Sequence, residues 1–233
     1  IEVDRRLVKN RMGILRERLK QIEKERNVQR AGRKDVLKVA LVGYTNAGKS
    51  TLFRSLTGAD AYVADQLFAT LDPLVRRVML PGGSPVVLAD TVGFIRDLPH
   101  GLVKAFAATL QEAAEADLLL HVVDISHPQY EEQMAVVNET LRELGSGEKP
   151  VLTIFNKMDK YESQTFDQWL EASTKQEILN DLYQRWDHET GGQCVFIAAT
   201  ERRNLDKLRV TILEKVKEMY RIRYPYREIT VSR

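Results

Sequence analysis

The stretch GYTNAGKS at residues 43–50 decides the fold of this chain. It has the G-x-x-x-x-G-K-S form of a phosphate-binding loop, whose glycines let backbone N–H groups converge on a phosphate at a helix N-terminus. Lys49 is expected to reach the β- and γ-phosphates of a nucleotide, and the Ser50 hydroxyl is expected to bind Mg²⁺. The other residues expected to line the nucleotide here are Gly43, Asn46, Ala47, Gly48 and Thr51.

The sequence around this loop alternates between short apolar runs and helical patterns. Near-continuous apolar runs are typical of strands that are buried on both faces of a parallel sheet. The predicted strands of this kind are 37–42, 86–89, 118–123, 151–155 and 195–198, and 74–80 is a candidate edge strand. The predicted helices are 49–57, 102–116, 130–144, 166–171, 175–187 and 205–220. This order predicts a doubly wound α/β domain with a mainly parallel six-stranded sheet, which binds ligands at the carboxyl ends of its strands.

A second motif, Asp90-Thr91-Val92-Gly93, directly follows the predicted strand 86–89. A carboxylate at that strand end can hold Mg²⁺ through water, and the Gly93 N–H can contact a γ-phosphate. D-x-x-G is a weak signal by itself. Its place at the end of the next core strand after a phosphate loop favours a loop that senses the state of the nucleotide.

A third motif, Asn156-Lys157-Met158-Asp159, follows the predicted strand 151–155. The Asp159 carboxylate can accept hydrogen bonds from the ring N–H and the exocyclic amine of guanine, a donor pair that adenine lacks. Asn156 is expected to brace the phosphate loop, and the stem of Lys157 is expected to lie on the base. The three motifs in this order predict a Mg²⁺-dependent enzyme that hydrolyses GTP to GDP and phosphate.

Three further segments carry a resemblance to a known family: 65–73 (DQLFATLDP), 90–100 (DTVGFIRDLPH) and 2–6 (EVDRR). They resemble the HflX-type GTPases, which belong with the Obg-like translation-factor GTPases. The resemblance implies a P-loop GTPase G domain in a fragment that lacks most of the family's N-terminal domain. It also implies that the partner is the large ribosomal subunit with its RNA, and that the function is the splitting or rescue of stalled ribosomes under stress.

The resemblance also assigns residues. Thr70 would be the switch threonine that closes on Mg²⁺ and the γ-phosphate, so the expected metal ligands are Ser50, Thr70 and Asp90 and the expected catalytic residues are Lys49, Thr70 and Gly93. The family's Ser-Ala pattern at the last strand is replaced by Ala198-Ala199 here. The Ala199 N–H is still expected to contact guanine.

Phe94 stands where many small GTPases have the glutamine that orients the attacking water. A phenyl ring cannot position water by hydrogen bonding, so Phe94 is expected to pack, and intrinsic hydrolysis is expected to be slow and stimulated by the ribosome. Asn46 matches the cation-ligating asparagine of related potassium-stimulated GTPases, which leaves two roles open: a K⁺ ligand or a turn residue. His121 lies inside an apolar run, and a core role is expected for it.

The charges are unevenly distributed along the chain. Residues 1–35 carry a net charge of +6 and the remainder −4, and apolar residues recur every seven positions from Ile1 to Ile22. We therefore predict a basic helical arm and linker over 1–35, a GTP-binding domain over 36–220, and a C-terminal tail or stub of a further region over 221–233. The positive charge of the arm is expected to bind a polyanion. The alternative is that these charges only keep one face of the helix in contact with water.

Composition limits the class of protein further. The single cysteine excludes a disulfide framework and fits a reducing compartment, here the cytoplasm. No apolar run in the sequence approaches the ~20 residues that a membrane-spanning helix needs. The protein is expected to be a monomer. The leading hypothesis is a nucleotide-controlled switch on the large ribosomal subunit. The alternative is a GTP-dependent binding module for a non-ribosomal partner, with incidental hydrolysis.

Overall fold

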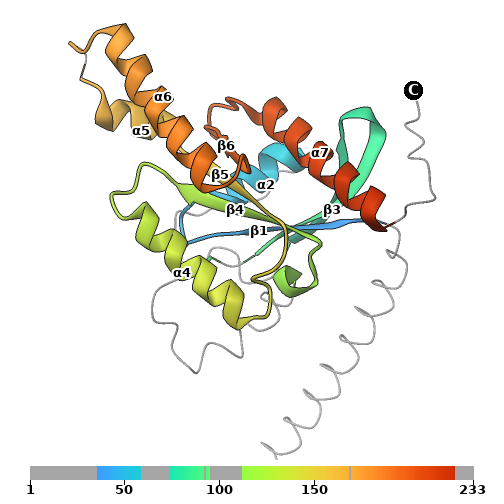
Figure 1. The fold of residues 1–233 in the computed structure, drawn as a ribbon. Coiled ribbons are helices and arrows are strands. Elements are labelled where there is room, and N and C mark those ends of the chain that lie inside the picture. The colour runs from blue at the N-terminus through green and yellow to red at the C-terminus, as the bar shows by residue number, and fades with distance from the viewer. Residues whose placement is uncertain (1–35, 59–73, 92, 95–111, 168, 224–233) are drawn as a thin grey trace, which may run out of the picture. The chain divides into compact units, whose positions relative to one another are not determined.

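The computed structural model of the chain describes residues 36–58, 74–91, 93–94, 112–167 and 169–223 (Figure 1). All of them except Val36 belong to one compact unit, Leu37–Arg233. The predicted basic arm, Thr70 and residues 224–233 lie outside the described residues, so what the sequence predicts for them stays a prediction.

The centre of the fold is a six-stranded sheet with the strand order β2-β3-β1-β4-β5-β6. The strands are β1 (Lys38–Val42), β2 (Leu74–Leu80), β3 (Ser84–Asp90), β4 (Leu118–Asp124), β5 (Val151–Asn156) and β6 (Cys194–Phe196). Only the β2–β3 pair is antiparallel, and the other four pairs are parallel. The predicted doubly wound, mainly parallel sheet is therefore confirmed.

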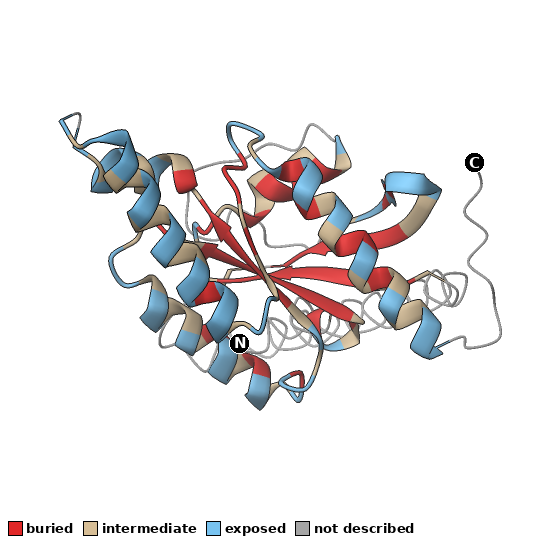
Figure 2. Ribbon diagram, turned by 45° about the horizontal axis from the view of Figure 1, so that its top comes forward, coloured by how far each residue is buried: buried red, intermediate tan, exposed pale blue. Residues whose placement is uncertain are grey.

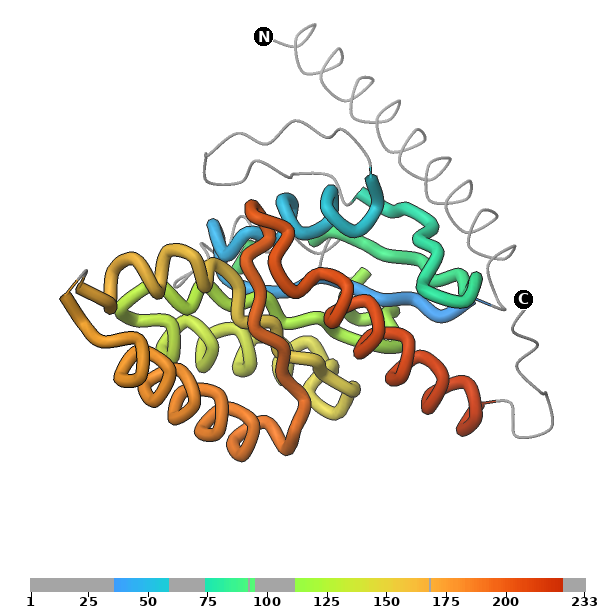
Figure 3. Tube along the Cα trace, turned by 90° about the horizontal axis from the view of Figure 1, so that it is seen from above, coloured from blue at the N-terminus to red at the C-terminus, as the bar shows by residue number. Residues whose placement is uncertain are grey.

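Helices cover both faces of this sheet. They are α2 (Lys49–Thr57), α4 (Tyr130–Glu143), α5 (Met158–Thr165), α6 (Ala172–Glu189) and α7 (Leu205–Arg223), and a short 3₁₀ turn, η1 (Pro81–Gly83), joins β2 to β3. Figure 3 shows α5 and α6 at the end of the sheet opposite the β2–β3 hairpin, as the strand order requires.

Strand β1 shows why the sequences of the central strands are apolar at successive positions. Val39 and Leu41 belong to one buried cluster, which includes residues of α2 and α7. Ala40 and Val42 belong to a second, which includes residues of α4. Successive strand residues point to opposite faces, so a strand with a helix layer on each side needs apolar residues at every position. Figure 2 shows the result: buried strands between helices whose outer faces are exposed.

The region between β5 and β6 differs from the sequence prediction. The predicted helix 166–171 is wrong: α5 occupies Met158–Thr165, and Phe166 is its extended C-cap. After it, the Asp167 carboxylate accepts the Trp169 N–H at 3.3 Å, a local side chain–backbone bond that competes with helix formation. Of the predicted helix 102–116, residues 112–115 are helical, and those before them lie outside the described residues.

His121 occupies the core position expected for it, and it makes the stability of the fold depend on pH. It is 2% exposed within β4, and burial, together with the charge of Lys49, lowers its pKa to about 4 from the ordinary 6.5. As the pH falls from 6.5 to 4, His121 is therefore protonated in the unfolded chain but stays neutral in the folded chain. We expect the free energy of unfolding to fall by up to about 3 kcal/mol over this window because of His121.

Urea denaturation at a series of pH values measures this effect. The variant His121→Leu should lose less stability than the wild type between pH 6.5 and 4, while the exposed His188→Gln should keep the wild-type slope. Equal slopes in the wild type and His121→Leu would contradict the prediction.

Candidate functional site

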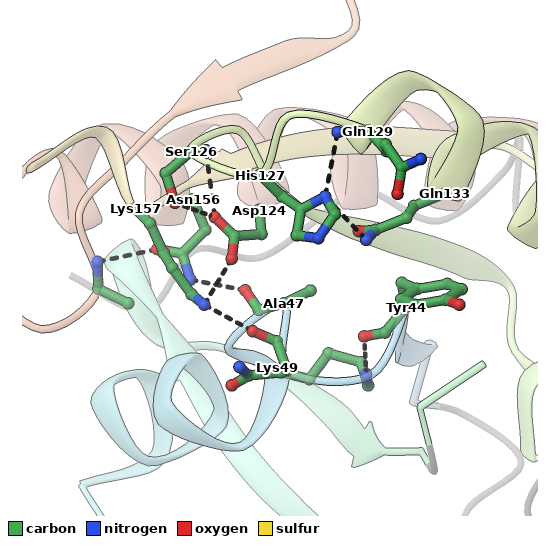
Figure 4. A network of polar contacts seen from close by, with 12 residues as sticks. Tyr44, Ala47, Lys49, Asp124, Ser126, His127, Gln129, Gln133, Asn156 and Lys157 are labelled. Carbon is green, nitrogen blue, oxygen red and sulfur yellow. Dashed lines mark hydrogen bonds and ion pairs between the residues drawn. The ribbon is translucent and has the colours of Figure 1, made fainter. Parts of the chain in front are cut away.

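The predicted phosphate loop connects β1 to α2 at the carboxyl edge of the sheet (Figure 4). Gly48 is the N-cap of α2 and has a φ of 94°. A Cβ atom on Gly48 would lie 2.3 Å from Nδ2 of Asn156, so only glycine fits at this position. Thr51 follows in the first turn of α2, where it is half-buried.

The Lys49 side chain folds back over this loop. Its Nζ donates hydrogen bonds to the carbonyl oxygens of Gly43, at 3.0 Å, and Tyr44, at 2.8 Å. Burial lowers the pKa of Lys49 to about 8, and the nearby Asp90 carboxylate partly opposes that shift. A phosphate group beside this ammonium would favour its charged form, because an opposite charge raises the pKa of a lysine.

Asp90 ends β3 next to the loop, and it is fully buried. Neither carboxylate oxygen has a hydrogen bond of normal geometry among the described residues. Burial raises the pKa of Asp90, and the Ser50 hydroxyl and the Lys49 ammonium act in the opposite direction. A buried carboxylate whose oxygens lack a well-formed hydrogen bond, beside a hydroxyl, offers an all-oxygen donor set, which fits a hard cation such as Mg²⁺.

The chain after Asp90 is joined to the phosphate loop by backbone hydrogen bonds. The Phe94 N–H donates to the Gly43 carbonyl at 3.0 Å, and the Thr45 N–H donates to the Phe94 carbonyl at 2.8 Å. A Cβ on Gly93 would lie 2.7 Å from Thr45 Cα and 2.9 Å from Lys49 Nζ, so Gly93 lies directly against the loop. The Phe94 side chain is 2% exposed and belongs to a core cluster, which confirms the packing role expected for it.

Asn156 joins the phosphate loop to the loop that follows β6. Its Nδ2 donates to the Ala47 carbonyl and its Oδ1 accepts the Ala199 N–H, each at 3.0 Å. The predicted brace of the phosphate loop is thus confirmed. The Ala199 N–H, which the sequence led us to expect at guanine, is bonded to Asn156 instead. Ala198 lies in a backbone bridge with Arg203.

Lys157 adds a contact that the sequence did not predict. Its Nζ lies 2.6 Å from Oδ2 of Asp124 and donates to the Asn46 carbonyl at 2.7 Å (Figure 4). Asp124 was missed by the sequence analysis. The available signal was its place directly after the apolar run 118–123, because a polar residue at the end of a central strand lies at the same edge as the motifs. Asp159 lies in the first turn of α5, half-buried.

The residues of the three motifs thus come together at the carboxyl ends of β1, β3 and β5. A phosphate loop, a buried carboxylate after β3 and an N-K-x-D run after β5, placed in this way on a doubly wound sheet, define the G domain of a P-loop GTPase.

The chain belongs to the family described as 50S ribosome-binding GTPase, which matches residues 38–157. It is 44% identical over 230 residues to GTPase HflX of Flavobacterium psychrophilum, covering 97% of this chain and 55% of that protein. It is 55% identical over 164 residues to GTPase HflX of Caldanaerobacter subterraneus subsp. tengcongensis, covering 70% of this chain and 38% of that protein. The resemblance to HflX-type GTPases is confirmed, and the chain spans about half the length, or less, of these two curated relatives.

The fold also matches a solved structure, that of a GTP-binding protein from the hyperthermophilic archaeon Sulfolobus solfataricus in complex with GDP. The TM-score is 0.57 at 28% sequence identity, with 88% of this chain and 58% of that chain covered. Within the described residues, no helix is both long and apolar enough to cross a bilayer.

Proposed function

We propose that this chain is the GTP-hydrolysing switch of a ribosome-associated GTPase, which converts GTP to GDP and phosphate and acts on the large ribosomal subunit in ribosome splitting or rescue under stress. The observation that carries the nucleotide part is the pair of 3.0 Å hydrogen bonds made by Asn156. They connect the phosphate loop to the loop after β6, and Asn156 is itself the first residue of the guanine motif. The family membership supports the ribosomal part.

The phosphate end of the site uses residues of the first two motifs. Lys49 would leave the carbonyls of Gly43 and Tyr44 for the β- and γ-phosphates, and the Gly93 N–H would contact the γ-phosphate. Ser50 would hold Mg²⁺ directly, and Asp90 would hold it through water. When bound, that metal would neutralise the charge that develops on the phosphates.

Thr70 would complete the metal site in the GTP state. It lies outside the described residues, four positions before Leu74. Leu74 pairs with Asp90 in the β2–β3 hairpin. The match of segment 65–73 to the HflX-type GTPases supports this role for Thr70.

The base end uses residues of the third motif and of the last loop. Asp159 would pair with the two donors of guanine, and the stem of Lys157 would lie on the ring. Ala198 and Ala199 would line the base through their backbone. A direct contact between the Ala199 N–H and guanine requires that N–H to be shared with, or released from, Asn156.

Hydrolysis assays with purified ribosomal subunits test the ribosomal part. We expect large subunits to stimulate GTP hydrolysis by this chain and small subunits not to do so. No stimulation by any ribosomal particle would favour the alternative, a binding module for a non-ribosomal partner.

Binding of the chain to large subunits, measured at a series of salt concentrations, separates the basic arm from the rest of the surface. The double variant Arg11→Glu/Arg18→Glu should weaken large-subunit binding and lower its salt slope by about 2, because each phosphate contact contributes roughly one unit. The matched double variant Lys207→Glu/Arg221→Glu changes the same charge on exposed positions of α7 and should bind as the wild type does. Equal losses in the two variants would mean that only total charge matters.

Potassium is the second proposed source of stimulation. Phe94 is buried in the core and cannot orient the attacking water as a glutamine would. We therefore expect intrinsic turnover no faster than about 10⁻² s⁻¹. A K⁺ ion near Asn46 would act as a fixed positive charge, so hydrolysis should be faster in KCl than in NaCl at equal ionic strength. Asn46 has a φ of 60°, and Asn46→Gly therefore removes the side chain without straining the backbone.

We expect Asn46→Gly to abolish the difference between the two salts. A salt difference that survives in this variant would place the ion elsewhere. Equal rates of the wild type in KCl and NaCl would leave Asn46 as a turn residue.

A further inference from the structure

The ends of β4 and β5 place one carboxylate, Asp124, beside the guanine motif. Asp124 and Asn156 are register partners in the parallel β4–β5 pair. The Ile125 N–H donates to the Asn156 carbonyl at 3.1 Å, so the two segments stay hydrogen-bonded for one residue beyond the end of β4. As a result, Asp124 lies next to Lys157, the residue that follows Asn156 (Figure 4).

Both oxygens of the Asp124 carboxylate are in use. Oδ2 lies 2.6 Å from Nζ of Lys157, and Oδ1 accepts hydrogen bonds from the Ser126 hydroxyl, at 2.6 Å, and the Ser126 N–H, at 3.1 Å. The side chains of Lys157 and Asp124 are only 16% and 14% exposed. Ser126 therefore orients a carboxylate that is largely shielded from water, and the carboxylate in turn orients Lys157.

The other contact of Lys157 lies in the phosphate loop. Its Nζ donates to the Asn46 carbonyl at 2.7 Å. Lys157, with a φ of 66°, and Asn46, with a φ of 60°, are both in the left-handed region. Asparagine adopts this region readily in turns, but a lysine rarely does unless its surroundings hold it there. The ammonium thus joins the turn of the phosphate loop to the turn that precedes α5.

We propose that Asp124 is a positioning residue for the nucleotide, acting through Lys157. It holds the ammonium on the Asn46 carbonyl, which keeps the turn of the phosphate loop in place, and it keeps the Lys157 stem extended on the side where the base is to lie. This inference deepens the proposed function and rests on it. An exposed ion pair would matter little, but the loss of one partner of a shielded pair leaves the other charge uncompensated.

A double-mutant cycle on the 233-residue chain tests the inference. We expect Asp124→Asn to raise the Kd for GDP and the KM for GTP by about tenfold, the usual effect of losing a hydrogen bond to a charged group. The value of kcat should stay within about twofold, because a contact made equally in the ground and transition states affects only binding. In a Lys157→Met background, Asp124→Asn should change the Kd by less than about twofold, since the residue through which it acts is gone.

Two variants provide controls. Glu131→Gln removes the same charge from an exposed pair with Arg185, 3.0 Å apart, and should leave the Kd for GDP unchanged. Ser126→Ala keeps the Asp124 charge but removes one of its hydrogen bonds. It should raise the Kd in the same direction by a smaller factor, and it gives a usable measurement if Asp124→Asn does not fold.

Three results would overturn the inference: an unchanged Kd for Asp124→Asn with an unchanged Kd for Ser126→Ala, equal effects of Asp124→Asn in both backgrounds, or a fall in kcat with an unchanged KM. A wild-type chain that binds ADP as well as GDP would instead overturn the proposed guanine site. This outcome is distinguishable from a failure of the Asp124 inference because it is observed in the wild-type chain.

Discussion

Replacing Asp159 by asparagine is expected to change which nucleotide the protein binds. The variant should bind GTP on the order of 100-fold to 1,000-fold more weakly, because a site built to pair with two donors rejects a partner that it cannot match. Xanthosine triphosphate should gain affinity, since its C2 oxo group pairs with the amide of the new side chain. Competition between fluorescent GDP and unlabelled GTP, XTP and ATP measures this change.

The matched control for this substitution is Asp181→Asn, which makes the same chemical change on an exposed position of α6. It should bind all three nucleotides as the wild type does. Unchanged GTP affinity in Asp159→Asn would show that guanine is read elsewhere.

The substitution Gly48→Ala should also abolish nucleotide binding at micromolar concentrations, and it should lower the free energy of unfolding. Its methyl group would lie 2.3 Å from Asn156 Nδ2, at a backbone φ of 94°. Asn156 must then move, and its hydrogen bonds to Ala47 and Ala199 are lost together. We expect a destabilisation of about 2–4 kcal/mol, from the strained backbone and two broken bonds of a buried side chain.

Gly58→Ala isolates the backbone part of this effect. Gly58 has a φ of 68°, and a Cβ there would meet nothing within 4 Å. It should therefore be destabilised by about 1 kcal/mol and should bind nucleotide normally. Equal nucleotide affinities for Gly48→Ala and Gly58→Ala would mean that the Asn156 contact does not matter for the site.

The sequence was sufficient to predict the central strands of the sheet, because they lie between two helix layers and are apolar on both faces. The three motifs were equally predictable, since their spacing is dictated by the nucleotide. The helix after β5 could not be predicted from the sequence, because α5 begins within the N-K-x-D motif, at Met158. Its first residue directly follows Lys157, which is in the left-handed region. Local hydrophobic periodicity gives no sign of such a start.

Contacts between distant segments were the other part that the sequence could not supply. The bond from Ala199 to Asn156 and the ion pair between Lys157 and Asp124 depend on which strands are neighbours and where each one ends. The motif identifies Asn156 and Lys157 from the sequence, but it does not identify Ala199 and Asp124 as their partners. Only the register of β4 against β5 brings Asp124 into the site.

The bond between Asn156 and Ala199 also gives the protein a built-in reporter. An amide proton exchanges with solvent when its hydrogen bond opens, and the Ala199 proton is held by a side chain rather than by a neighbouring strand. That side chain keeps its place because it also bonds to Ala47, next to Gly48. Deuterium uptake at Ala199, in the loop after β6, therefore reports the opening of the phosphate loop, without any label attached to the nucleotide site.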